Sequence, residues 1–161
     1  MARPQGTSAR AQRVNAAVAT SLLAVATAVA LARVFSGGGA GWRLLAAGIA
    51  SGLLACAMER KNLLLATAVS AVGMVVAVGL WVFPDTTLHG LPTMHTLHAI
   101  GSASRQVGEL ARVQVAPTVP LRPLLLAALT SVWAAIFSAH ALAFRAGSPL
   151  LALLPPVALV A

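Results

Sequence analysis

The sequence predicts an all-α integral membrane protein with four full transmembrane helices, an incomplete fifth, and one amphipathic surface helix in an extracytoplasmic loop. Its 161 residues are 59% hydrophobic and 9% charged, whereas a soluble domain carries about 25% charged residues. So little charge cannot cover a water-soluble globule, and so much apolar content excludes intrinsic disorder. Apolar runs near the roughly 20 residues of a membrane span recur along the chain, separated by short polar or glycine-rich turns.

The N-terminal part is predicted to begin with a cytoplasmic tail, residues 1–13, and to enter the membrane with the apolar run Val14–Phe35. This run has no ionisable residue before Arg33, whose long side chain can reach the interface from the end of a helix. A cleaved signal peptide is the alternative, because residues 30–32 read Ala-Leu-Ala. The run exceeds the roughly 7–15 apolar residues of a signal peptide, which favours a retained helix.

Two further runs complete a predicted region of three transmembrane helices, residues 14–83. The glycine-rich stretch 36–41 permits a chain reversal, and the second run, about Trp42 to Met58, follows it. A polar hairpin turn at 59–62 leads to the third run, Leu63–Phe83, which a proline follows. We expect all three runs to cross the membrane.

Residues 84–123 are predicted to form an extracytoplasmic loop with a helix over 94–112. Apolar residues recur there at steps of three and four, which is typical of one helix face. The helix is too polar to span, so this face suits either lying flat on the bilayer or packing on the spanning helices. Thr93 is the predicted N-cap, and prolines keep residues 113–123 extended. The apolar face consists of Leu97, Ile100, Val107 and Leu110.

The C-terminal part, residues 124–161, is predicted to hold the fourth span, Leu124–Phe144, and the start of a fifth. The last apolar run, Leu150–Ala161, has 12 residues. As a helix it would rise about 18 Å, short of the roughly 30 Å of the hydrocarbon layer. We therefore expect the natural chain to continue, with a re-entrant or partner-buried end at Pro155–Pro156 as the alternative.

The placement of arginine and lysine predicts a cytoplasmic N-terminus in the plasma membrane. With this orientation six basic residues lie inside and five outside, and the inner ones occupy short segments near helix ends. The turns at 59–62 and 145–149 then lie in the cytoplasm, and the loop 84–123 lies outside.

One ionisable side chain and a face of small residues are the candidate sites within the spans. His140 lies in the fourth run, where an ionisable residue is a functional candidate, and a neutral imidazole bonded to a neighbouring helix is the alternative. Gly48 and Gly52 share one face of the second run, and small residues of this kind let helices approach closely. Gly73 and Ala77 offer a partner face on the third run. We expect a contact within the chain, with a dimer as the alternative.

The sequence holds no catalytic constellation, and we expect neither a cofactor nor a metal. His89, His95 and His98 gather in the loop, but a metal site needs three or four converging ligands, so polar surface residues are the simpler interpretation. A single cysteine, Cys56, excludes an intramolecular disulfide. The net charge of +8 comes from arginines spread beside apolar runs, which does not favour a nucleic-acid partner.

Several motifs follow one another in the second half of the chain. They are Leu91-Pro92-Thr93, an Ala-Pro-x-x-Pro stretch at 116–120, a leucine-rich span from residue 124, and Leu-Leu-Ala-Leu-Leu-Pro-Pro at 150–156. Their order resembles the N-terminal membrane region of bacterial TgpA-like transglutaminase-family proteins. The resemblance implies an extracytoplasmic transglutaminase-like domain with a Cys-His-Asp triad beyond this sequence, so no catalytic residue carries over to it.

The expected function is a multi-pass membrane anchor or scaffold that holds such an extracytoplasmic domain, without catalysis by this segment. A small multi-pass membrane protein that acts in transport or assembly is the alternative. The expected partners are the lipid bilayer and either other membrane helices or the missing C-terminal part of the same protein.

Overall fold

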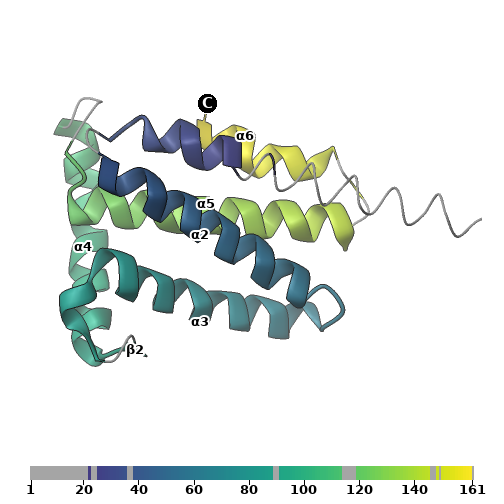
Figure 1. Cartoon of the computed structure of the whole chain (residues 1–161), viewed down its shortest axis with the longest axis horizontal. Helices are drawn as coiled ribbons and strands as arrows, with labels where there is room; N and C mark the ends of the chain where they lie inside the picture. The colour runs from purple at the N-terminus through teal and green to yellow at the C-terminus, as the bar shows by residue number, and fades with distance from the viewer. Residues whose placement is uncertain are drawn as a thin grey trace, which may run out of the picture.

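A computed structural model describes residues 22, 25–35, 38–88, 91–113, 119–145, 148 and 150–160. These residues are mostly helical. Three long helices, α2 (Gly38–Ala57), α3 (Leu63–Val82) and α5 (Arg122–Phe144), lie side by side (Figure 1). Helix α4 (Met94–Val113) runs across one end of these three, which we call the α4 end. The opposite end, where α5 finishes, is called the Arg145 end.

The predicted helical membrane class is confirmed in its coarse form. Helices α2, α3 and α5 are long and apolar enough to cross a membrane, by length and composition. The predicted total of four full spans and a partial fifth is not shown. Residues 25–32 form part of the first predicted helix, but the beginning of that run lies outside the described residues. The fifth run contains a short 3₁₀ turn, η2 (Leu151–Leu153), and α6 (Leu154–Val160).

The α2–α3 hairpin follows its prediction closely. Helix α2 begins at Gly38, within the predicted glycine turn, because glycine disfavours a helix by only about 1 kcal/mol and does not block one. The Asn62 side chain accepts a hydrogen bond from the Leu64 N–H at 3.4 Å and caps the start of α3. Helix α3 ends at Val82, just before Pro84, as a proline with no N–H would require.

Helix α5 lies at the centre of the packing. It contacts α2, α3, α4 and α6, and its buried positions recur along much of its length. The largest fully buried side chains include Leu125, Leu129 and Val132 of α5 and Leu44 of α2. Lipid tails are as apolar as leucine, so van der Waals packing and interhelical hydrogen bonds, rather than escape from water, hold such a bundle together.

Two boundaries near prolines differ from the prediction. Helix α5 begins at Arg122 and includes Pro123 in its first turn, where the missing N–H would have had no helical partner. The same argument applies to Pro155 and Pro156 in the first turn of α6. These prolines therefore lie in the first turns of α5 and α6 and do not prevent the two helices from forming.

The described residues between α3 and α4 form local structure that the sequence pattern did not predict. A 3₁₀ turn, η1 (Pro84–Thr86), is followed by a short antiparallel pair of strands, β1 (Thr87–Leu88) and β2 (Leu91–Pro92). Thr87 pairs with Pro92, and Leu88 pairs with Leu91. Strands of two residues are too short to produce an alternating pattern, which explains why they were missed.

Candidate functional site

A chain of hydrogen bonds crosses the interior of the bundle and joins its three long helices. The Ser51 hydroxyl on α2 donates to the backbone carbonyl of Trp133 on α5 at 2.9 Å. The indole Nε1–H of Trp133 donates to the Ser70 hydroxyl on α3 at 3.0 Å. All three residues are buried. Polar groups in a membrane interior are costly when unpaired, so these bonds both satisfy the groups and fix the relative placement of the helices.

Gly73 of α3 lies beside this chain of bonds. A Cβ atom added at Gly73 would lie 3.0 Å from Leu54 Cδ2 on α2 and 3.3 Å from the Trp133 ring on α5. The lack of a side chain therefore lets two neighbouring helices press against α3 at the same level. Gly73 was singled out from its spacing, but Trp133 and the two serines were not.

The other small residues of the predicted packing face are also inside the bundle, with a different partner. Gly48 and Ala77 are buried. A Cβ atom at Gly52 would lie 3.8 Å from Ile136 Cγ2 on α5, an ordinary van der Waals distance. The helix opposite Gly52 is thus α5, whereas the sequence offered α3 as the partner face. The contact is within the chain.

His140 lies near the Arg145 end and is only 5% exposed. Its Nδ1 atom is 3.9 Å from the Cys56 sulfur on α2, and its ring stacks at a tilt on Phe144, with centroids 4.4 Å apart. The Nε2 atom is buried without a hydrogen-bond partner. The imidazole thus lies against a neighbouring helix, beside the thiol of Cys56.

Arg145 joins the end of α5 to the turn between α2 and α3. Its guanidinium donates to the carbonyl of Met58 at 2.7 Å and to the carbonyl of Lys61 at 2.9 Å. The carbonyls at the end of a helix have no partners within the helix and carry partial negative charge. The cation that follows α5 thus binds two carbonyls of the turn that follows α2.

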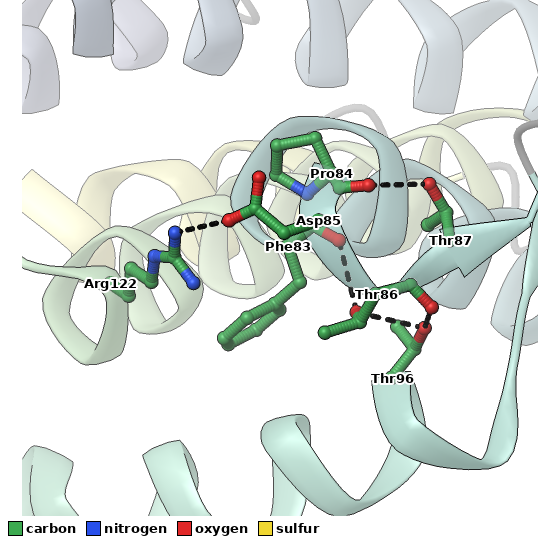
Figure 2. Close-up of polar contacts among 7 residues, drawn as sticks. All are labelled: Phe83, Pro84, Asp85, Thr86, Thr87, Thr96 and Arg122. Carbon is green, nitrogen blue, oxygen red and sulfur yellow. Dashed lines mark hydrogen bonds and ion pairs between the residues drawn. The ribbon is translucent and has the colours of Figure 1, made fainter.

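At the α4 end, Thr86, Thr93 and Thr96 tie the start of α4 to the turn that follows α3, and Figure 2 shows Thr86 and Thr96 of this group. The Thr86 carbonyl accepts hydrogen bonds from the hydroxyls of Thr93 at 2.7 Å and Thr96 at 2.8 Å. The Thr96 hydroxyl also accepts from the Thr93 N–H at 3.1 Å, as the Glu or Gln of a capping box would. Thr93 precedes the helix as predicted, but its hydroxyl donates to Thr86.

Two further contacts hold the same region. Arg122, the first residue of α5, pairs with Asp85 of η1 at 2.5 Å, and both side chains are exposed (Figure 2). Gly79 of α3 allows close approach: a Cβ atom there would lie 3.1 Å from Thr87 Cγ2 and 3.4 Å from Thr96 Cγ2. The turn η1 is thereby tied to α5, and α4 approaches α3 at Gly79 and packs along α5.

The predicted apolar face of α4 is only partly covered. Ile100 is half-buried against the core beside the buried Ala103, so the middle of this face packs on the spanning helices. Val107 and Leu110 are half-buried, and Leu97 is 49% exposed. Of the two alternatives, packing on the bundle accounts for the centre of the helix.

The loop histidines are not brought together with other ligands. His95 and His98 are exposed on α4, and His89 lies outside the described residues. Across the described ranges, no group of three His, Cys, Asp or Glu side chains could hold a metal ion.

The sequence carried weak signals for the residues that were missed. Ser51 and Ser70 are isolated polar residues within apolar runs, and Trp133 lies near the middle of its run rather than at an interface. A buried tryptophan requires an acceptor for its N–H, and the Ser70 hydroxyl supplies it. No protein-family model, curated protein or solved structure matches the chain.

Proposed function

We propose that this chain is a multi-pass membrane anchor and scaffold of the plasma membrane, with a cytoplasmic N-terminus. We further propose that it is the membrane region of a TgpA-like transglutaminase-family protein, which holds an extracytoplasmic catalytic domain. The observation that carries the scaffold proposal is the position of α4, which lies across one end of the spanning helices, packs on α5 and approaches α3 at Gly79 (Figure 1). Such a helix is a fixed platform at the membrane surface.

The internal polar groups support a scaffold better than a transport path. A transporter places paired ionisable or polar groups along a route through the membrane. Here Ser51, Ser70 and Trp133 bond to one another across helices, and His140 faces Cys56. Within the described residues, the contacts of these polar groups therefore hold neighbouring helices together.

The proposed orientation agrees with the arrangement of the two ends. Met58, Lys61 and Arg145 meet at one end of the bundle, and Asp85 and Arg122 meet at the other. Counted together with the N-terminal tail 1–13, the basic residues favour the cytoplasm for the first of these ends by six to five. The α4 end would then face outward, where the attached domain would lie.

Cysteine labelling in intact cells tests the orientation. In a Cys56→Ala background, a Ser104→Cys variant should react with a membrane-impermeant maleimide added outside. An Arg60→Cys variant should react only after the membrane is permeabilised. The reverse pattern would overturn the proposed orientation. Mass spectrometry of the native product tests the family proposal, which expects a mass well above the 16.3 kDa of this sequence and a transglutaminase-like segment.

A role in assembly is the second candidate, and a specific groove favours it. An open groove of about 330 Å³ lies between helices α5 and α6. Small side chains line its α5 wall, and such surfaces allow close helix approach. If assembly were the function, Ser138→Leu would reduce recovery of a co-purifying membrane protein. The lining residues are Ser131, Ala134, Ala135, Ser138, Pro155, Ala158 and Leu159.

A further inference from the structure

Two tryptophans meet at the α4 end of the bundle. Trp42 lies in the first turns of α2 and Trp81 lies in the last turn of α3, and these antiparallel helices bring them together. The indole rings form an edge-to-face pair with centroids 6.4 Å apart. Trp42 is 53% exposed, so the pair is open to its surroundings. Tryptophans at the ends of spanning helices lie at the level of lipid headgroups.

Arg43 lies against this pair, and no acceptor among the described residues bonds to its Nε atom. Its guanidinium carbon is 5.8 Å from the centroid of the Trp42 ring, within the range of a cation–π contact. Its Nε atom is buried without a hydrogen-bond partner. Asp85, an acidic residue of the same end, is engaged by Arg122. A charged group with an unpaired buried N–H is costly, so we expect the guanidinium to gain an acceptor from outside the chain at its other nitrogens.

We propose that Arg43, Trp42 and Trp81 form a binding site for the phosphate of an anionic phospholipid. This inference is independent of the proposed scaffold function. Guanidinium binds phosphate oxygens with parallel, charge-assisted hydrogen bonds, and a phosphodiester lies at the same depth as interfacial indoles. The start of α2 adds partial positive charge on the same side.

The charge of this end selects an anionic lipid over a zwitterionic one. Basic residues outnumber acidic residues on the described segments that meet there, which disfavours the positive choline group of phosphatidylcholine. The acyl chains of the bound lipid would extend from the headgroup level along the apolar surface of α2, where Ile49 and Leu53 are exposed. The basic residues are Arg33, Arg43, Arg105, Arg112 and Arg122, and the acidic ones are Asp85 and Glu109.

Native mass spectrometry of the full chain in detergent tests the site. The protein is titrated with phosphatidylglycerol or phosphatidylcholine of identical acyl chains, and phosphatidylglycerol binding is repeated with inorganic phosphate as competitor. We expect phosphatidylglycerol to bind roughly tenfold more tightly than phosphatidylcholine, and Arg43→Gln to remove this preference, because one charged hydrogen-bond pair corresponds to about that factor. Arg43→Lys, which keeps the charge but not the planar fork, should retain only part of it.

Arg112→Gln is the matched control, because it removes the same charge from an exposed residue at the same end. It should change phosphatidylglycerol affinity by less than about twofold, as expected for a screened surface charge. Equal losses in Arg43→Gln and Arg112→Gln would overturn the site in favour of a diffuse field. Equal affinity for both lipids, or displacement by millimolar inorganic phosphate, would also overturn it. Circular dichroism of each variant confirms that the helices are intact.

Discussion

The Trp133 indole on α5 donates a hydrogen bond to the Ser70 hydroxyl on α3 at 3.0 Å, while the Trp133 carbonyl accepts from Ser51 on α2 at 2.9 Å. One residue thus bonds to two neighbouring helices, through its side chain on one side and its backbone on the other. The relative rotation of α2, α3 and α5 about their axes is thereby restricted at this level.

Removing the bond between Ser70 and Trp133 should measurably loosen the bundle. Ser70→Ala and Trp133→Phe should each destabilise the folded protein in micelles, and a double-mutant cycle should give a coupling of about 0.6 kcal/mol and no more than about 1.7 kcal/mol. Equilibrium unfolding in mixed micelles provides the measurement. Thr130→Ala is the control for the cycle, because within the described residues the Thr130 hydroxyl bonds only to carbonyls of its own helix. Equal coupling of Thr130 and Ser70 to Trp133 would contradict the assignment.

Filling the space at Gly73 should push the helices apart. Gly73→Val should destabilise the protein by about 1–3 kcal/mol, because its branched side chain meets Leu54 Cδ2 and the Trp133 ring. Thermal unfolding followed by circular dichroism reports the effect. Gly101→Ala on α4 is the control, since no atom beyond the adjacent residues and backbone of its own helix lies within 4 Å of a Cβ there. It should be neutral or stabilise α4 by up to about 1 kcal/mol. A Gly73 variant as stable as the Gly101 variant would mean that the helices do not approach closely at this point.

Loss of Arg145 should open the turn between α2 and α3. Arg145→Gln removes the cation that bonds to the Met58 and Lys61 carbonyls, and should speed amide hydrogen exchange at residues 58–62. A local loss of roughly 1 kcal/mol corresponds to about fivefold faster exchange. Arg60→Gln, in the turn itself, removes an equal charge and should leave exchange nearly unchanged. If both variants accelerate exchange equally, net charge rather than the specific contact protects the turn.

Charging the packed face of α4 should release the helix from the bundle. Ile100→Asp combined with Val107→Asp places carboxylates on half-buried positions and should increase cleavage of residues 84–123 by an externally added protease. Ser102→Asp with Ser104→Asp adds the same charge on exposed positions of the same helix. That control should be cut at close to the parent rate. Identical cleavage of parent and of both variants would show that the face has no packing role.

The spans and the surface helix could be predicted because each depends on local composition. Apolar length defined α3 to within one residue of its observed end, and apolar periodicity located α4 from Met94. These signals do not depend on which helices become neighbours. Proline boundaries were less accurate because the same residue that ends one helix can open the next.

The choice of partners could not be predicted, because it depends on how side chains from distant segments fit. Gly52 faces Ile136 rather than α3, and His140 faces Cys56, which is 84 residues away in the chain. Small residues and single serines are common in an alanine-rich sequence, so their spacing does not identify the opposing helix. The threonine bonds around Thr86 similarly depend on a close approach at Gly79 that the sequence does not specify.

The bonds of Arg145 have a consequence for biosynthesis. The arginine lies 84 and 87 residues beyond the two carbonyls that it binds, so the turn between α2 and α3 is synthesised long before its partner. At about 5–20 residues per second, the ribosome needs roughly 4 to 17 s to reach Arg145. During this interval the Met58 carbonyl can accept from the Lys61 N–H of the same turn, whereas headgroup water must satisfy the Lys61 carbonyl, and the hairpin is an unfinished insertion intermediate. Translation of the end of α5 is therefore the step that completes it.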